Sequence, residues 1–159
     1  SSDLVGVELG GALKNIIAIG AGFIDGYGLG NNGKSAFVTR GLAEITRLGV
    51  AMGARAETFA GLSGMGDLVA TCYSDLSRNR YVGQQLAKGR SAAEIVGGMD
   101  QVAEGVMTTR AAVAVADSLG VDMPIASVTR AVLAGELDPQ SAVEGLMRRT
   151  PVSETESPR

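Results

Sequence analysis

The sequence predicts an all-α domain, a multi-helix bundle around one glycine-rich apolar helix. Apolar residues recur at spacings of three and four, helix-start signals recur along the chain, and alternating strand patterns are nearly absent. The 159 residues are 45% hydrophobic and 19% charged, which is typical of one compact domain. We expect that domain at 1–149 and a disordered tail at 150–159, because Pro, Ser, Thr and Glu dominate the tail.

The longest apolar stretch, Leu9 to Ile24, predicts a buried central helix. Glycines interrupt it repeatedly, and their missing side chains allow neighbouring helix backbones to approach closely. Its isoleucines are also compatible with a strand, because short apolar runs do not reveal their period, but the length favours a helix. Lys14 and Asn15 divide the stretch, so we expect it to fall short of the ~20 apolar residues that span a bilayer.

A second helix is predicted over 33–52, after a loop at 25–32. Its apolar residues recur at helical spacing and are Phe37, Val38, Leu42, Ile45 and Leu48. The residues that we assign to its charged face are Lys34, Arg40, Glu44 and Arg47. The pattern is that of an amphipathic helix.

Helix-start signals continue through the second half of the chain. A loop at 61–66 precedes a short helix at 67–73, whose first residue, Asp67, suits the positive end of the helix dipole. Ser77 is an N-cap candidate for a helix that continues to Lys88. Further helix starts are marked by a capping-box pattern or by a proline, at Ser91–Glu94, Pro124 and Pro139.

Composition excludes several classes of chemistry. The chain has no His and one Cys, so catalysis by imidazole, an internal disulfide and a zinc site are excluded, and no metal site is expected. A net charge of −3, with 14 scattered basic residues, offers no broad positive face for nucleic acid. The chain begins Ser-Ser-Asp, without an initiating Met or a secretory signal pattern, so we expect a cytoplasmic protein or an excised piece of one.

The segment Gly28-Leu-Gly30-Asn-Asn-Gly33 matches GxGxxG, a pattern in which glycines let a pyrophosphate approach a helix N-terminus. A true dinucleotide site follows a strand and is answered by an acidic residue about 20 positions later. This segment instead joins two predicted helices, and only Glu44 is near. We favour a flexible helix connection and keep a nucleotide site as the minor alternative.

Lys14 is a candidate acid-base group. It is one of only three lysines and stands among Gly, Ala, Leu and Ile. An ammonium group held away from water gives up its proton more readily, which suits general acid-base catalysis. The alternative is a lysine that reaches the surface along its alkyl stem.

Asp67 and Thr71 are four residues apart, so a helix projects both from one face, and the glycines at 64 and 66 leave room for a ligand. The alternative is that Asp67 only complements the helix dipole.

The segment Ser77-Arg78-Asn79-Arg80 places two arginines in the first turn of a helix, where they oppose the dipole unless an anion binds there. Backbone amides, the Asn79 amide and a guanidinium group together predict a phosphate site. The alternative is a solvated basic patch.

Several segments in order carry a family resemblance. They are Gly10-Gly11-Ala12-Leu13-Lys14-Asn15, Gly20-Ala21-Gly22, Gly64-Met65-Gly66-Asp67-Leu68, Thr71-Cys72, Ser77-Arg78-Asn79-Arg80 and Val102-Ala103-Glu104-Gly105. Over roughly residues 4–148 the chain closely resembles the C-terminal domain of bacterial NAD(P)-dependent glycerol-3-phosphate dehydrogenases, and several spaced motifs are more specific than any one of them.

The resemblance implies an enzyme that interconverts dihydroxyacetone phosphate and sn-glycerol 3-phosphate for glycerophospholipid synthesis. Its cofactor, NADH or NADPH, is bound mainly by an N-terminal Rossmann domain, and no strand-GxGxxG-helix unit precedes Lys14 here. The chain would then be the helical substrate domain, inactive alone, with the phosphate substrate and its own Rossmann domain as partners. Neither nucleic acid nor a membrane span is expected, and the formation of a homodimer is left open.

The resemblance also implies roles for individual residues. Lys14 matches the catalytic lysine, which accepts a proton when the alcohol is oxidised and donates one when the ketone is reduced. The substrate-binding positions match Lys14, Asp67, Thr71, Ser77, Arg78 and Asn79. The positions that touch the cofactor match Arg78, Val102 and Glu104.

Two other functions stay open at this point. The helical domain of another β-hydroxyacid-type dehydrogenase shares the two-domain plan and a lysine on a central helix, but the phosphate segment at 77–79 argues against it. A non-catalytic helical dimerisation module fits the glycine-rich helices, and in that case Lys14→Met would disturb assembly rather than turnover.

Overall fold

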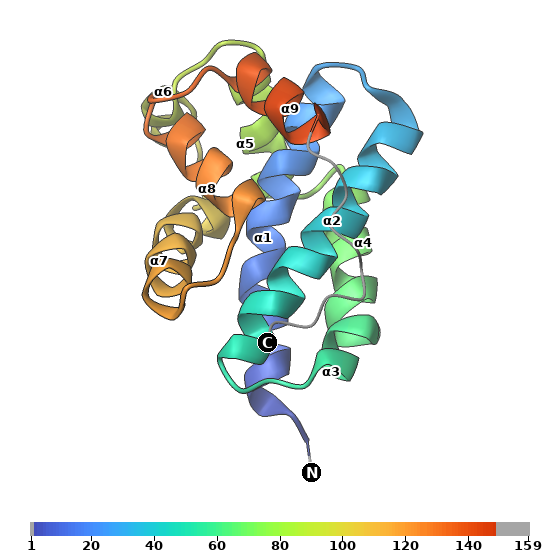
Figure 1. Ribbon diagram of the computed structural model, residues 1–159. Coiled ribbons are helices and arrows are strands. Elements are labelled where there is room, and N and C mark those ends of the chain that lie inside the picture. The colour runs from blue at the N-terminus through green and yellow to red at the C-terminus, as the bar shows by residue number, and fades with distance from the viewer. Residues whose placement is uncertain (1, 149–159) are drawn as a thin grey trace.

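The computed structural model describes residues 2–148, and this part of the chain is a bundle of helices without a strand. The predicted all-α class is therefore confirmed. Figure 1 shows α1 through the middle of the bundle, with α2 and α4 on one side and α7 and α8 on the other. These helices are α1 (Leu4–Gly26), α2 (Gly30–Ala51), α4 (Asp67–Tyr73), α7 (Glu104–Leu119) and α8 (Pro124–Leu133). The tail predicted to be disordered, 150–159, lies outside the described residues.

Helix α1 is the core of the bundle, and Ile16, Ile17 and Phe23 are almost fully buried. The helix starts at an Asp cap, in which Asp3 Oδ1 accepts the Gly6 N–H at 2.9 Å. Helix α1 extends beyond the apolar stretch in both directions. By length and composition alone it could therefore cross a membrane, and the expectation that it is too short to do so is wrong. The other helices bury 56% of its most apolar window, which is the pattern of a core helix.

Two glycines bring α1 and α5 (Arg78–Ala87) into backbone contact, as the glycine pattern predicts. A Cβ on Gly83 would lie 1.9 Å from the Ile19 carbonyl oxygen, and a Cβ on Gly22 would lie 2.1 Å from the Arg80 carbonyl oxygen. Side chains at these positions would push the helices apart. The first turn of α5 is therefore fixed directly against the central helix.

The connection between α1 and α2 is shorter than the loop predicted at 25–32, because only Tyr27–Leu29 separates the helices. Gly28 and Gly30 take φ angles of +66° and +72°, which lets the chain reverse within so few residues. Gly33 lies inside α2. The GxGxxG segment thus joins two helices, which is a helix connection and not the strand-turn-helix context of a dinucleotide site.

The charged face predicted for α2 is wrong for Lys34 and Glu44. Glu44 is 1% exposed, and its carboxylate oxygens accept the N–H groups of Ile125 and Ala126, at 2.9 and 2.8 Å, in the first turn of α8. Lys34 is 2% exposed and donates to the Asp25 carboxylate at 2.9 Å. Both partners belong to other helices, so the pattern of α2 alone does not reveal them.

The remaining elements are α3 (Ala56–Ala60), the π-helical turn η1 (Leu62–Gly66), α6 (Ala92–Gly97) and α9 (Pro139–Arg148). The turn η1 replaces the loop predicted at 61–66, whereas α4 and α5 begin where their caps predict. The capping box of Ser91 and Glu94 is confirmed in both directions. Asp138 caps α9 by accepting the Ser141 N–H at 2.9 Å.

Candidate active site

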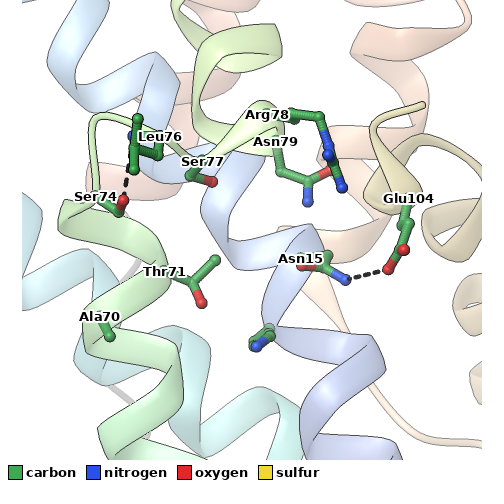
Figure 2. Close-up of a pocket in the computed structure, with 10 residues that line it drawn as sticks. Asn15, Ala70, Thr71, Ser74, Leu76, Ser77, Arg78, Asn79 and Glu104 are labelled. Carbon is green, nitrogen blue, oxygen red and sulfur yellow. Dashed lines mark hydrogen bonds between the residues drawn. The ribbon is translucent and has the colours of Figure 1, made fainter. Parts of the chain in front are cut away.

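A cavity of about 400 Å³ opens where α1, α4, α5 and the start of α7 meet (Figure 2). Its lining residues are Lys14, Asn15, Ala70, Thr71, Ser74, Leu76, Ser77, Arg78, Asn79 and Glu104. All the predicted site residues except Asp67 and Val102 are among them. The volume lies in the range of small-molecule sites.

Lys14 and Asp67 form an ion pair at the cavity wall, with Nζ 2.5 Å from Oδ2. Asp67 is the first residue of α4, and a close approach of Gly10 to the Ser63 carbonyl oxygen seats the preceding turn against α1. The two side chains are 21% and 40% exposed. Lys14 is therefore neither deeply buried nor extended freely into solvent, because one carboxylate holds its ammonium group beside the cavity.

Ser77, Arg78 and Asn79 form a second polar region of the cavity, which we call the α5 end. Ser77 caps the helix, since its Oγ accepts the Arg80 N–H at 3.2 Å. Asn79 is 7% exposed, and its Oδ1 accepts the Gly105 N–H at 2.9 Å. Because this hydrogen bond turns the amide oxygen toward Gly105, the Nδ2 donor points toward the cavity (Figure 2). Side-chain and first-turn N–H donors therefore converge here, as an anion site requires.

The two arginines of the first turn of α5 have different partners. Arg80 Nε donates to Asp25 and its Nη1 donates to Asp75, both at 2.6 Å. Arg78 donates to the neutral amide oxygen of Gln101 and pairs with no carboxylate within residues 2–148. The charge of Arg80 is compensated, whereas that of Arg78 is available to an anion in the cavity.

The other predicted residues lie around this arrangement. Thr71 Oγ1 donates to the Asp67 carbonyl oxygen at 2.7 Å and keeps lone pairs that can accept from a ligand. Glu104 begins α7 and accepts a long, 3.5 Å hydrogen bond from Asn15 Nδ2. Val102 is 62% exposed and does not line the cavity. Sequence reasoning missed Asn15 as a lining residue, although its polar side chain within the apolar stretch was a usable signal.

Other reactive groups do not contribute to the cavity. In the part of the chain that the structure describes, no three His, Cys, Asp or Glu side chains are placed to hold a metal ion. The sole cysteine, Cys72, is buried in α4, and this burial raises the pKa of its thiol to about 12. A thiol that stays protonated is a poor nucleophile. The chemistry of the site therefore depends on Lys14 and its neighbours.

Comparison with known proteins establishes the family. Residues 3–144 match the family model described as NAD-dependent glycerol-3-phosphate dehydrogenase C-terminus. The chain belongs to this family.

Curated relatives of this glycerol-3-phosphate dehydrogenase domain are similar over nearly all of the chain. The NAD(P)+ glycerol-3-phosphate dehydrogenase of Methylibium petroleiphilum is 58% identical over 158 residues, which are 99% of this chain and 47% of the relative. That of Polaromonas naphthalenivorans is 59% identical over 154 residues, which are 97% of this chain and 44% of the relative. The chain thus spans about half the length of the curated relatives it matches.

Solved structures of the family share the helical bundle. The glycerol-3-phosphate dehydrogenase of Coxiella burnetii superposes with a TM-score of 0.90 at 42% identity, over 94% of this chain and 46% of that one. The Saccharomyces cerevisiae glycerol-3-phosphate dehydrogenase superposes with a TM-score of 0.83 at 29% identity, over 93% of this chain and 43% of that one. The family resemblance of the sequence motifs is confirmed by both comparisons.

Proposed function

We propose that this chain is the substrate domain of an NAD(P)-dependent dehydrogenase that interconverts dihydroxyacetone phosphate and sn-glycerol 3-phosphate. The observation that carries the proposal is one cavity lined both by Lys14, which is paired with Asp67, and by the α5 end, whose Arg78 has no carboxylate partner in residues 2–148. A proton-transfer group and an anion site thus face the same small volume. A role in glycerophospholipid synthesis and a cytoplasmic location are expectations of the same proposal.

The α5 end would hold the substrate phosphate. Arg78 supplies a guanidinium group that no carboxylate of the described residues compensates, Asn79 supplies an amide donor, and the helix start supplies backbone N–H groups. Ser77 lines the same region and holds the helix start in shape. Binding energy at the phosphate, which does not react, then orients the reacting carbon toward Lys14.

Lys14 would exchange a proton with the substrate oxygen. When the ketone is reduced, the carbonyl carbon gains a hydride and the oxygen gains the proton that Lys14 Nζ donates. When the alcohol is oxidised, the hydroxyl proton returns to Nζ as the carbon loses the hydride. Asp67 holds the ammonium group in place through its 2.5 Å contact. Thr71, one helical turn further, is placed to accept a hydrogen bond from the hydroxyl group of the substrate.

The hydride would come from bound NADH or NADPH when the ketone is reduced, and would go to bound NAD+ or NADP+ when the alcohol is oxidised. Residues 2–148 contain no strand and hence no Rossmann unit, so a further domain would hold most of the cofactor, and the chain alone would be inactive. Arg78 and Glu104 at the cavity and the exposed Val102 beside it present one positive, one negative and one apolar side chain to that domain. These three residues fit a supporting contact with the cofactor.

The helical domain of another β-hydroxyacid-type dehydrogenase is the second candidate. Arg78, which pairs with no carboxylate among residues 2–148, and the oriented Asn79 favour a phosphorylated substrate over an uncharged one. Comparing turnover of dihydroxyacetone phosphate with that of dihydroxyacetone therefore separates the two candidates.

The decisive experiment measures oxidation of NADH and NADPH with dihydroxyacetone phosphate by the full-length protein that carries this domain. We expect Lys14→Met to lower kcat by at least about 100-fold, since general acid-base groups contribute this much, while binding of glycerol 3-phosphate persists. Lys88→Met, which changes an exposed lysine of the same chain, is the matched control. A parent protein that ignores dihydroxyacetone phosphate refutes the substrate, whereas an active Lys14→Met variant refutes only the role of Lys14.

A further inference from the structure

We propose that Arg80 is a positioning residue that fixes the α5 end of the cavity from behind, without touching the substrate. The proposal rests on the proposed function, because the α5 end matters only if a phosphate binds there. Arg80 is not among the lining residues of the cavity.

The contacts of Arg80 join three parts of the fold. Its Nε donates to Asp25 Oδ2 near the end of α1, and its Nη1 donates to Asp75 Oδ1 in the segment between α4 and α5, both at 2.6 Å. The same Nη1 lies 3.5 Å from the carbonyl oxygen of Tyr73, the last residue of α4. The Arg80 side chain is only 14% exposed, so these are contacts of an enclosed group and not of a mobile surface arginine.

A second buried cation supports Asp25. Lys34 Nζ donates to the same Oδ2 at 2.9 Å, and the Lys34 side chain is 3% exposed. Its ammonium group also lies 4.3 Å from the centre of the Tyr73 ring, which is a cation-π contact. Helices α1, α2, α4 and α5 therefore meet in one cluster of paired charges behind the cavity.

The cluster controls the segment 74–77, which contributes Ser74, Leu76 and Ser77 to the cavity lining. Arg80 contacts the residue before this segment, a residue within it and, through its own backbone N–H, the Ser77 cap. The local contacts inside the segment are few, namely a 3.1 Å bond from Leu76 N to Ser74 Oγ and a 3.2 Å bond from Ser77 N to Ser74 O. Arg80 thereby holds segment 74–77 and the Ser77 cap in place against α1 and α4, which keeps the α5 end in shape.

The guanidinium geometry explains why an arginine is needed. A planar fork presents several N–H donors in fixed directions and reaches Asp25 and Asp75 at once, whereas the ammonium group of a lysine is a single point. Arg80→Lys therefore keeps the charge and loses the bridge. Asp75→Ala removes one arm of the bridge at a side chain that is 96% exposed, so it leaves the core packing intact.

The test measures KM for dihydroxyacetone phosphate and kcat in the full-length protein. We expect Arg80→Lys to raise KM by about tenfold, because it loses the bridge, and Asp75→Ala to raise KM by a few-fold, because it loses only the solvent-exposed arm, with kcat nearly unchanged in both. The controls are Arg90→Lys at an exposed arginine and Asp117→Ala at an exposed aspartate. A merely structural role would lower the active fraction, and hence kcat, without raising KM.

The outcomes separate this proposal from the proposed function. If Arg78→Ala raises KM but Arg80→Lys and Asp75→Ala leave it unchanged, the positioning role is refuted and the phosphate site stands. If Arg78→Ala also leaves KM unchanged, the phosphate site itself is refuted. If Arg80→Lys lowers the unfolding temperature, the Asp75→Ala variant, which changes an exposed side chain, tests the positioning role instead. An unchanged KM in Asp75→Ala then overturns the proposal.

Discussion

The buried carboxylate of Glu44 should make the stability of this domain depend on pH. Burial raises the pKa of Glu44 from 4.5 to about 7, against the opposing effect of the two N–H groups of α8 that it accepts. The folded state thus binds the proton more tightly than the unfolded state does. The contribution of Glu44 to the free energy of unfolding is fully present below pH 4.5 and is lost as the pH rises to about 7.

The magnitude follows from the size of this shift. At about 1.4 kcal/mol per pKa unit, a rise from 4.5 to about 7 corresponds to roughly 3 kcal/mol of unfolding free energy. Glu44→Gln keeps the shape of the side chain and removes its titration. The difference in unfolding free energy, wild type minus Glu44→Gln, should therefore fall by roughly 3 kcal/mol between pH 4.5 and 7, while the effects of other titrating groups cancel.

Urea unfolding followed by circular dichroism gives this difference at each pH. Glu57→Gln is the matched control, because the Glu57 side chain is 77% exposed and its difference from wild type should stay nearly constant. The reasoning is refuted if the difference in unfolding free energy between wild type and Glu44→Gln does not change with pH, or if it changes in the opposite direction. It would show that the two N–H groups and the dipole of α8 outweigh the cost of burying the charge.

Three other changes test single contacts. Arg78→Ala should raise KM for dihydroxyacetone phosphate by about 100-fold, since the proposed contact between the guanidinium group and the phosphate is lost, and an unchanged KM contradicts the phosphate site. Gly83→Ala should lower the unfolding free energy by about 3 kcal/mol, because its Cβ would meet the Ile19 carbonyl oxygen, whereas Gly145→Ala, in open space, should raise it by up to about 1 kcal/mol. Cys72 should react with a thiol reagent only after unfolding, and fast labelling of the folded chain contradicts its burial.

The helix starts were predictable because their determinants are local. The Ser91 cap and Glu94 are three residues apart, and the partners of Ser77 and Asp138 lie within the following turn. A capping bond needs only the helix that it starts, so the sequence window contains everything the bond requires. The same holds for the close approach at Gly83, where the absence of a side chain is itself the signal.

The assignment of charges failed where the partner is distant in sequence. Glu44 caps a helix that starts 80 residues later, at Pro124, so its place in the pattern of α2 suggests a charged surface face. Arg78 and Arg80 look equivalent in the first turn of α5, and only the folded positions of Asp25 and Asp75 separate them. Which cation is free is a tertiary property that no local pattern encodes.

That difference between the arginines also fixes the direction in which a phosphorylated ketone would lie. A phosphate group carries about −1.5 to −2 charges at pH 7, so it would bind near the positive end of α5 and Arg78, which has no carboxylate partner in residues 2–148. The Lys14–Asp67 pair is neutral as a unit and suits the uncharged carbonyl group. Glu104, on the α7 side, would repel the phosphate and confine it to the side of Ser77. The charge arrangement would thus orient the proposed substrate before any reaction starts, and removing the Glu104 charge should loosen this orientation without weakening phosphate binding.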